Sequence, residues 1–164
     1  MSDPSIREAS LRDLAAINDI FNHYVLNSTA TFHEQPLSTE DRLAWWRQHE
    51  ERFPVLVAEA EDQVLGWAAL TPYNGRCGYR FTVEDTIYLR PGACGTGLGR
   101  RLLTELLERG RAAGFHSVVA AIAADSAPSL RLHKALGFRE VGRLREIGFK
   151  FGRWLDVVLV QRSL

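Results

Sequence analysis

The feature that most constrains this chain is a glycine-rich stretch at residues 90–101 that runs directly into an amphipathic helix. The stretch reads Arg-Pro-Gly-Ala-Cys-Gly-Thr-Gly-Leu-Gly-Arg-Arg, and leucines then recur at helical spacing from Leu98 to Leu107 before Gly114 ends the helix. Glycines let main-chain N–H groups approach an anion closely, and the dipole of a helix N-terminus favours negative charge. The sequence therefore predicts an anion-binding loop between a strand and a helix, although a tight turn before a helix would use the same glycines.

The distribution of charge supports an anionic ligand in the second part of the chain. The 20 basic and 20 acidic side chains cancel, which argues against a protein that mainly captures nucleic acid or an anionic membrane. Residues 1–62 contain five basic and 12 acidic side chains, whereas residues 63–164 contain 15 and eight. The range 86–104 holds three arginines and no carboxylate. We therefore expect a small anionic ligand at the glycine loop, and no nucleic-acid or membrane partner.

Three phosphate-containing ligands compete for the glycine loop. A P-loop needs a lysine after its glycines, and none follows here. A dinucleotide-binding loop needs its third glycine at the position that Arg100 takes, and it belongs at the first strand-to-helix turn of a domain. The pyrophosphate of coenzyme A is the remaining candidate, and it fits best.

Hydrophobic periodicity predicts strands and helices in the order β-α-α-β-β-β-α-β-α-β-β, which implies a mixed sheet with helices on its faces. Two helices are expected to begin at a serine with an aspartate three residues later, at Ser10 and Ser38. No repeat or linker interrupts the chain, so we expect one domain over residues 1–164. Strands are expected over 54–60, 64–70, 79–89, 116–123, 138–147 and 154–162, with helices over 11–25, 38–46, 98–107 and 130–136.

We expect a cytoplasmic protein that holds no metal. The first residues show no signal peptide, and the longest apolar run, 118–124, is far shorter than the roughly 20 residues of a spanning helix. Cys77 and Cys94 are too few for a disulfide framework and fit a reducing compartment. Neither cysteine has Cys or His neighbours at the spacing of a zinc site.

Several further segments match one enzyme family in order along the chain. Together with the glycine loop, they make the sequence resemble the GCN5-related N-acetyltransferases (GNAT), and more narrowly the phosphinothricin and methionine sulfone/sulfoximine acetyltransferase branch. The resemblance runs from about Ile6 to Gln161. The matching segments are Ile-Phe-Asn-His-Tyr-Val at 20–25, Ser-Thr-Ala-Thr-Phe at 28–32, Thr-Val-Glu at 82–84, Leu132-His133 with Gly137-Phe138, and Gly-Phe-Lys-Phe-Gly-Arg-Trp-Leu-Asp at 148–156.

The resemblance implies an α/β GNAT fold with a mostly antiparallel central sheet, a splayed parallel strand pair, helices on both faces, and acetyl-CoA as the cofactor. This sequence departs from the family pattern at two positions. Cys94 replaces the usual Arg or Gln, and Ser126 replaces an Asn that contacts the cofactor in many relatives. Carried over residue by residue, the cofactor contacts are the main chain of Ile87, Tyr88 and Leu89 for the pantetheine arm, and Gly95, Thr96, Gly97, Leu98, Gly99 and Arg100 for the pyrophosphate.

Acetyl transfer to an amine needs a base, because an ammonium has no lone pair for attack. Glu84 matches the base that is proposed for the family, although an exposed strand carboxylate beside Asp85 is the plain alternative. His133 matches a position near the sulfur, where an imidazolium can protonate the leaving thiolate. Packing or capping of the helix explains that histidine equally well. Cys94 suggests a different route through an acetyl-cysteine, because a thiol near a helix N-terminus is activated, but the family implies direct attack in a ternary complex.

The resemblance implies a small amino-acid analogue such as phosphinothricin, methionine sulfone or methionine sulfoximine as the acceptor. Two arginines that flank a short turn could clamp its carboxylate through paired N–H donors. The residues concerned are Arg76, Cys77, Gly78, Tyr79 and Arg80. Alternatives are another small amine as acceptor, or a non-catalytic acyl-CoA sensor.

The aromatic side chains Phe32, Trp45, Trp46, Phe149 and Trp154 are expected mostly in the core. The resemblance also implies a homodimer, and it places the segments around Phe32 and 150–154 near the acceptor and the dimer contact.

Overall fold

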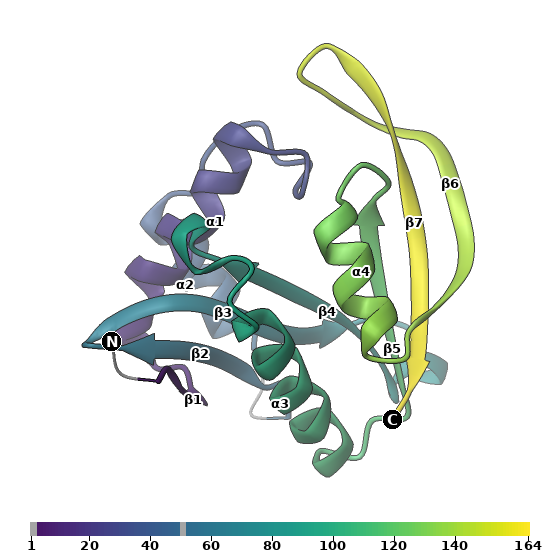
Figure 1. Ribbon diagram of the computed structural model, residues 1–164. Coiled ribbons are helices and arrows are strands. Elements are labelled where there is room, and N and C mark those ends of the chain that lie inside the picture. Colours follow the sequence, from purple (N-terminus) through teal and green to yellow (C-terminus); the bar gives the residue numbers. More distant parts are fainter. Residues whose placement is uncertain (1–2, 50–51) are drawn as a thin grey trace.

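A computed structural model describes residues 3–49 and 52–164, and within these ranges seven strands form one sheet in the order β1-β2-β3-β4-β5-β7-β6 (Figure 1). All neighbouring strands are antiparallel except β4 and β5, which are parallel. The strands are β1 Ser5–Glu8, β2 Val55–Ala60, β3 Gln63–Pro72, β4 Thr82–Leu89, β5 Ser117–Ala123, β6 Arg139–Lys150 and β7 Arg153–Ser163; the helices are α1 Leu14–Asn27, α2 Thr39–Arg47, α3 Leu98–Ala112 and α4 Ala127–Ala135.

The predicted order of elements and the mixed sheet are confirmed. Ser38 caps α2 as expected, since its Oγ accepts a hydrogen bond from the main-chain N–H of Asp41 at 3.1 Å. Ser10 forms the same kind of capping box with Asp13, but one turn of 3₁₀ helix, Leu11–Asp13, precedes α1. The predicted strand 79–89 begins only at Thr82, because Cys77–Tyr79 forms a 3₁₀ turn.

Helices cover both faces of the sheet and build two separate cores (Figure 1). Helix α3 packs its leucines against β2, β3 and β4 on one face, and Leu130 and Leu132 of α4 join this core. On the other face, α1 and α2 pack around Trp67, which is 2 % exposed. Burying leucine or tryptophan side chains contributes about 1.5–3 kcal/mol each, so the two cores hold the sheet rigid between them.

The parallel strands β4 and β5 pair over only three residues, from Thr82–Ser117 to Glu84–Val119. Beyond Glu84, β4 remains paired with β3 up to Leu89, while β5 remains paired with β7 up to Ala123. The two strands therefore diverge, and their facing edges carry main-chain groups that the sheet does not use. The predicted splayed pair is confirmed, and its fork lies at Glu84.

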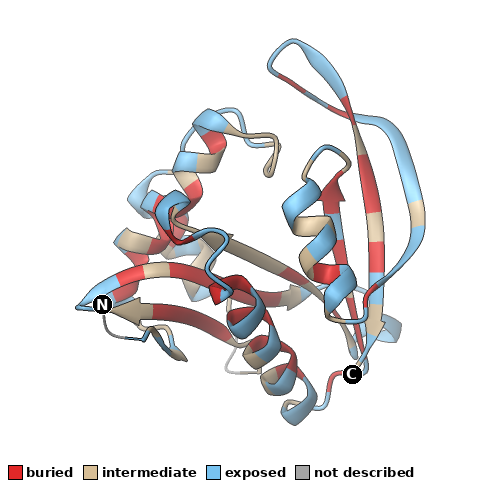
Figure 2. Ribbon diagram, in the orientation of Figure 1, coloured by how far each residue is buried: buried red, intermediate tan, exposed pale blue. Residues whose placement is uncertain are grey.

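The hairpin of β6 and β7 extends beyond the rest of the molecule, and β6 is largely exposed (Figures 1 and 2). The expectation that the aromatic set is mostly core is wrong for Phe149 and Trp154, which are 50 % and 62 % exposed. Their rings pack on each other at 5.0 Å between centroids, because each belongs to the outer face of this hairpin. Trp45 and Trp46 pack against the core between α1, α2 and the sheet, as expected. None of the helices in the described part of the chain has both the length and the apolar character that a membrane crossing requires.

Candidate active site

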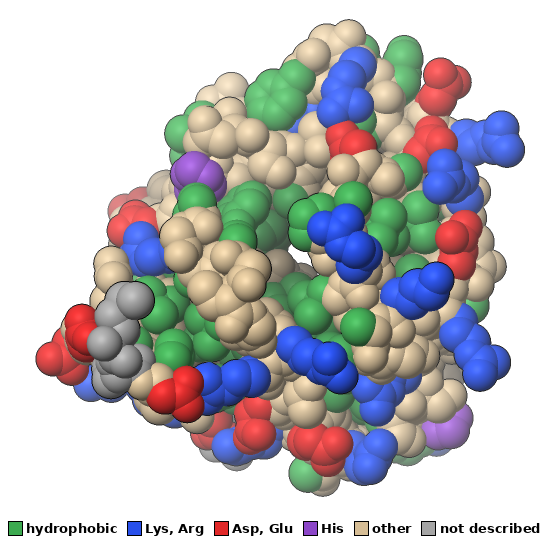
Figure 3. Space-filling model, viewed as in Figure 1, with side chains coloured by type: hydrophobic (Ala, Val, Ile, Leu, Met, Phe, Trp, Pro, Cys, Tyr) green, Lys and Arg blue, Asp and Glu red, His purple; other side chains and the backbone are tan. Residues whose placement is uncertain are grey.

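A cleft of about 920 Å³ opens where β4 and β5 diverge. Most of its lining comes from β4, β5, the glycine loop, α4, and the segment 28–32 that follows α1. The space-filling view shows the hollow in the middle of this face, with basic side chains gathered along one side of it (Figure 3). Segments that lie far apart in the sequence thus share one opening.

The glycine loop forms one wall of the cleft, which we call the loop wall (residues 94–100). Gly95 and Gly97 have φ values of +77° and +86°, which residues with a Cβ rarely adopt. Gly97 is the N-cap of α3, so the free N–H groups of the first helical turn face the loop. Thr96 stabilises the turn by donating a hydrogen bond from Oγ1 to the carbonyl of Ala93 at 2.8 Å. This arrangement is that of an anion-binding helix terminus.

Most of the predicted cofactor residues line the cleft, and two do not. Leu98 is 3 % exposed and packs its side chain into the core beneath the sheet, so only its main chain remains available to a ligand. Thr96 uses its hydroxyl inside the loop. The predicted residues found in the lining are Ile87, Tyr88, Leu89, Gly95, Gly97, Gly99, Arg100 and Ser126.

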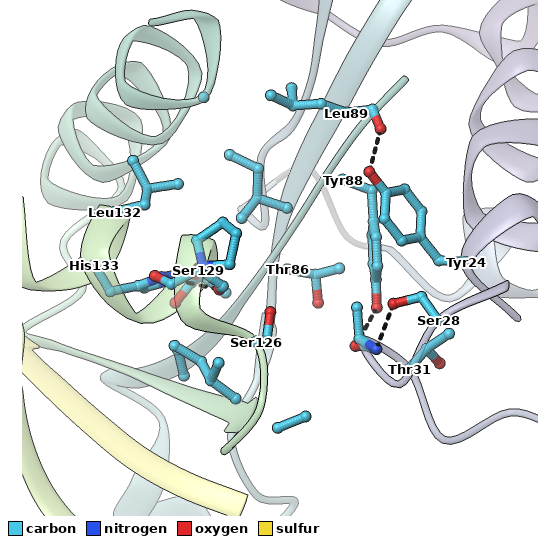
Figure 4. A pocket seen from close by; sticks show the side chains of 18 of the residues that line it. Tyr24, Ser28, Thr31, Thr86, Tyr88, Leu89, Ser126, Ser129, Leu132 and His133 are labelled. Carbon is cyan, nitrogen blue, oxygen red and sulfur yellow. Dashed lines mark hydrogen bonds and ion pairs between the residues drawn. The ribbon is translucent and has the colours of Figure 1, made fainter. Parts of the chain in front are cut away.

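Two tyrosines lie along the β4 side of the cleft (Figure 4). The hydroxyl of Tyr24 donates to the carbonyl of Leu89 at 2.6 Å, so this predicted pantetheine contact already has one partner in the protein. The hydroxyl of Tyr88 donates to the carbonyl of Ala30 at 3.2 Å. Burial raises the pKa of Tyr88 to about 12, which keeps its hydroxyl a donor at any ordinary pH. Tyr24 was not predicted as a cleft residue, because its strand partner is 65 residues away in sequence.

Glu84 lies at the fork itself and is half-buried. Strand neighbours face opposite ways, so Glu84 shares the α1/α2 face of β4 with Tyr88, and Asp85 points to the α3/α4 face. Burial raises the pKa of Glu84, and the charge of Asp85 raises it further. A carboxylate with a raised pKa is a stronger base than an exposed one, which is the property that the predicted role requires.

His133 is buried on α4, and both of its ring nitrogens have protein partners. Nε2 lies 3.0 Å from Oδ2 of Asp85, and Nδ1 lies 2.8 Å from the carbonyl of Ser129. A carbonyl and a carboxylate only accept hydrogen bonds, so this geometry favours the imidazolium, with both nitrogens donating. Burial lowers the pKa of His133, but the hydrogen bond and charge of Asp85 outweigh it and raise the pKa overall.

The Asp85–His133 pair joins β4 to α4 just past the fork. For His133 to protonate a leaving group in the cleft, one of its two bonds must break, and this role stays a prediction. The sequence did not reveal Asp85 as its partner. The available signal was a carboxylate on the strand face that Asp85 shares with the apolar residues Val83 and Ile87, because a buried carboxylate needs a donor from some other element.

The segment 28–32 forms the opposite wall of the cleft, which we call the segment wall. All five of its residues line the cleft. The hydroxyl of Thr29 donates to Asp125 at 2.8 Å, and Asp125 also pairs with Arg153 at the start of β7. The resemblance pointed to this segment, but it did not identify the contacts that hold it.

The structure does not bring the predicted carboxylate clamp into the cleft. None of Arg76, Cys77, Gly78, Tyr79 and Arg80 belongs to the cleft lining among the described residues, and all five are exposed. Arg80 instead donates to the carbonyl of Cys77 at 3.1 Å and lies over the ring of Phe81. Arg76 and Arg80 therefore need a rearranged turn, or a second copy of the chain, to reach a ligand in the cleft.

Cys94 lies on the loop wall, exposed and free of any disulfide. Its sulfur lies 3.8 Å from the hydroxyl of Tyr24 and 3.6 Å from the carbonyl of Arg90. Cys94 thus replaces a longer side-chain donor with a small one at the edge of the loop.

Comparison with known proteins gives results that agree with one another. A sequence model of the acetyltransferase (GNAT) family matches residues 17–138. The chain is 40 % identical to an L-methionine sulfoximine/L-methionine sulfone acetyltransferase of Salmonella typhimurium, covering 98 % of this chain and 94 % of the relative. It is 43 % identical to a phosphinothricin N-acetyltransferase of Streptomyces viridochromogenes, covering 96 % and 86 %. A solved acetyltransferase of Salmonella typhimurium with its cofactor acetyl-CoA superimposes with a TM-score of 0.95 at 40 % identity, covering 99 % and 95 %.

Proposed function

The chain belongs to the acetyltransferase (GNAT) family, and from that premise we propose that it transfers acetyl from acetyl-CoA to the α-amino group of a small amino-acid analogue. Relatives over nearly the whole chain are named for methionine sulfoximine, methionine sulfone and phosphinothricin. The observation that carries the proposal is that Glu84, a half-buried carboxylate with a raised pKa, shares one cleft with the glycine loop. A base and an anion site in one opening are what N-acetylation requires.

The cleft fits acetyl-CoA in shape and chemistry. The diverging edges of β4 and β5 offer main-chain donors and acceptors to the amides of a pantetheine arm. Gly95 and Gly97 have no side chain, and no other atom lies within 4 Å of the place where a Cβ would stand. The loop is therefore open to a pyrophosphate. Arg100 on the same wall adds positive charge. These residues, with Ser126 at the start of α4, would hold the cofactor.

Acetyl transfer requires that the amine and the thioester be held close together and that protons be moved. Bound acetyl-CoA supplies the acetyl group as a reactive thioester. Glu84 accepts a proton from the ammonium of the acceptor, directly or through water, and burial makes its carboxylate more basic than an exposed one. The free N–H groups at the N-terminus of α3 stabilise negative charge on the loop wall. His133, whose pKa is raised by Asp85, is the proposed proton donor to the leaving thiolate, once one of its two hydrogen bonds breaks.

An assay of thiol release with DTNB across a panel of amines tests the proposal. We expect rapid release with methionine sulfone, methionine sulfoximine and phosphinothricin, and slower release with ordinary amino acids, polyamines and a peptide amine. Preference for one of the slower group would keep the enzyme class but change the acceptor. Binding of acetyl-CoA without release for any amine would contradict catalysis and indicate a sensor of the cofactor.

The proposal retains a role for Arg76 in binding the acceptor carboxylate. Arg76→Ala should raise KM for carboxylate-bearing amines by about tenfold, since a charge-assisted hydrogen bond contributes about 1.5–3 kcal/mol. KM for an amine without a carboxylate should stay the same. An equal KM for both amines in the variant and the parent would remove Arg76 from the site.

We also propose a cytoplasmic homodimer. The β6–β7 hairpin exposes six large apolar side chains among its charged residues, and exposed apolar patches commonly mark a protein interface. Light scattering should give twice the chain mass, and Trp154→Glu should give the monomer; a monomer in the parent would contradict the dimer. The exposed apolar residues are Val141, Leu144, Ile147, Phe149, Phe151 and Trp154.

The proposed cytoplasmic location is supported by the two cysteines. Both are free, which fits a reducing compartment.

A further inference from the structure

Lys150, at the end of β6, has an unusual environment for a lysine. The chain contains two lysines and 18 arginines, and while Lys134 is exposed, Lys150 is 1 % exposed. Its ammonium donates to the carbonyls of Ser28 and Thr31 at 2.7 Å each, and to the carbonyl of Tyr24 at 3.5 Å. A fully buried ammonium is rare unless its donors are satisfied.

The three acceptors explain why a lysine occupies this position. An ammonium presents three donors from a single point, whereas a guanidinium presents its donors in a flat fork. The carbonyls of Tyr24 and Ser28 belong to the last turn of α1 and the residue after it, where the helix dipole places partial negative charge. Burial lowers the pKa of Lys150, and the charge of Glu34 opposes that change. The ammonium therefore closes the end of α1 and fixes the direction in which the chain leaves it.

The chain that leaves α1 at this point is the segment wall. Lys150 binds the carbonyls of its first and fourth residues, Ser28 and Thr31, and Tyr88 binds the carbonyl of Ala30 between them. Two residues before Lys150, Gly148 provides the surface on which Phe32 packs. A Cβ added at Gly148 would lie 2.2 Å from the Phe32 ring, so only glycine admits the ring in this place.

The β6–β7 hairpin thus holds a whole wall of the cleft through contacts that are more than 110 residues apart in sequence. In the proposed acetyltransfer, the loop wall binds the pyrophosphate of the cofactor, and Glu84 lies at the fork between the walls. The acceptor must approach Glu84 from the space that the loop wall leaves free, and the segment wall borders that space.

We propose that Lys150 is a positioning residue that sets the acceptor side of the cleft, by fixing the main chain of residues 28–32. This inference rests on the proposed acetyltransfer, and it adds a determinant of acceptor recognition that makes no contact with the reacting atoms. Displacement of this wall by an ångström is enough to cost about 100-fold in rate, because the acceptor must be aligned with its base.

Three variants test the proposal, with acceptor kinetics and acetyl-CoA affinity measured separately. In Lys150→Met, we expect kcat/KM for the acceptor to fall about 10- to 100-fold, while Kd for acetyl-CoA by calorimetry stays within about twofold. Lys150→Arg should not restore activity, because a planar fork cannot reach the three carbonyls. Lys134→Met is the matched control and should leave both quantities unchanged. Equal loss of acetyl-CoA affinity and acceptor kcat/KM would indicate a general structural defect and overturn the proposal.

Two further measurements keep the test decisive if the Lys150 variants do not fold. Gly148→Ala displaces the Phe32 ring and leaves the ammonium in place, so it should raise acceptor KM several-fold without affecting acetyl-CoA. In the parent protein, an amine-acylating reagent should label Lys134 at least about 100-fold faster than Lys150, as expected for a buried, fully bonded ammonium. Similar labelling rates, or a Gly148→Ala variant with unchanged acceptor KM, would overturn the proposal.

The position of the wall can also be read without turnover. Hydrogen exchange at residues 28–33 should be at least about tenfold faster in Lys150→Met than in the parent, with unchanged exchange in α3. This readout and the labelling remain informative even if no amine supports thiol release, so failure of the proposed function and failure of the Lys150 proposal are distinguishable. Unchanged exchange at 28–33 would overturn the role of Lys150.

Discussion

The two walls of the cleft are built in opposite ways. The loop wall, residues 94–100, consists of consecutive residues whose glycines and helix N-terminus present main-chain groups to a ligand. The segment wall, residues 28–32, is held from outside by Lys150, Tyr88 and Asp125, which come from three other elements. One wall follows from local sequence, whereas the other depends on the assembled sheet.

This difference matches the different tasks that we propose for the two walls. A pyrophosphate is the same for every acyl-CoA, so a wall of main-chain groups serves it whatever side chains lie around it. Acceptors differ in shape, so the segment wall must be able to differ between enzymes. It is held by separate contacts from distant residues, and substitution can change each of these contacts alone. We therefore expect variants of the loop wall to affect the cofactor, and variants of the segment wall to affect the acceptor.

The largest effect should come from Glu84→Gln, at the fork between the walls. Loss of a general base typically costs 10²- to 10⁴-fold in kcat, while acetyl-CoA affinity should change little. Because the pKa of Glu84 is raised, turnover of the parent should fall with decreasing pH at a value above that of an ordinary glutamate, as the base becomes protonated. A pH–rate profile of both proteins checks this. Turnover near the parental value would exclude Glu84 as the base.

The next largest effect should come from the Asp85–His133 pair, which links β4 to α4 beside the fork. Asp85→Asn should lower the free energy of unfolding by about 2 kcal/mol at pH 6, since a hydrogen bond between charged groups is lost. The pKa of His133 is raised in the folded state. The stabilisation is therefore present in full below the pKa of an unfolded histidine, and it is lost as the pH rises through the folded value. Urea unfolding from pH 6 to pH 9 should show that the difference in free energy of unfolding between the parent and Asp85→Asn becomes smaller. A constant difference would contradict the charged pair.

The loop wall should respond to Gly97→Val. A β-branched residue is strained at a φ of +86°, so the loop of the free variant should leave this torsion. Restoring the torsion on binding costs about 1–2 kcal/mol, which corresponds to roughly tenfold weaker binding of acetyl-CoA. Acceptor KM, measured at saturating acetyl-CoA, should be unaffected. Calorimetry and two-substrate kinetics make the comparison. An increase in acceptor KM alone would contradict the assignment of the two walls.

The segment wall should respond to Tyr88→Phe in the converse way. The variant removes the hydrogen bond to the carbonyl of Ala30 and leaves the ring and the strand in place. A single neutral hydrogen bond contributes about 1 kcal/mol, so acceptor kcat/KM should fall about fivefold. Acetyl-CoA affinity should hold, although the main chain of Tyr88 is a predicted cofactor contact. If the affinity for acetyl-CoA falls instead, Tyr88 belongs to the cofactor side.

The smallest effect should come from Cys94→Arg, which restores the side chain usual in the family. An added cation at the exposed edge of the loop should tighten acetyl-CoA binding about threefold at low salt, and less at high salt. The same variant lacks the thiol. Full turnover would therefore also exclude an acetyl-cysteine route, whereas loss of turnover with a trapped acetyl-enzyme in the parent would establish it.

Much of the fold could be predicted from periodicity and caps. The order of elements and the helix start at Ser38 agree with the structure, and so does the fork in the sheet, which the family resemblance implied. The exposure of Trp154 was missed, because an aromatic residue at strand spacing looks the same whether its strand is central or at a protruding edge. The strand predicted from Tyr79 begins only at Thr82 for a similar reason, since the period-2 pattern does not show where pairing begins.

The sequence by itself determined the loop wall, and the family resemblance singled out Glu84 as the predicted base. Residues 92–99 carry their conformation and their N–H groups with them, because glycine torsions and a helix start are local properties. Only the tertiary structure decided that Asp85 pairs with His133, that Lys150 closes the end of α1, and that the arginines at 76 and 80 stay outside the cleft. The physical reason is that a buried charge needs its partner wherever the fold places one, and contacts across 48 to 122 residues leave no spacing in the chain to read.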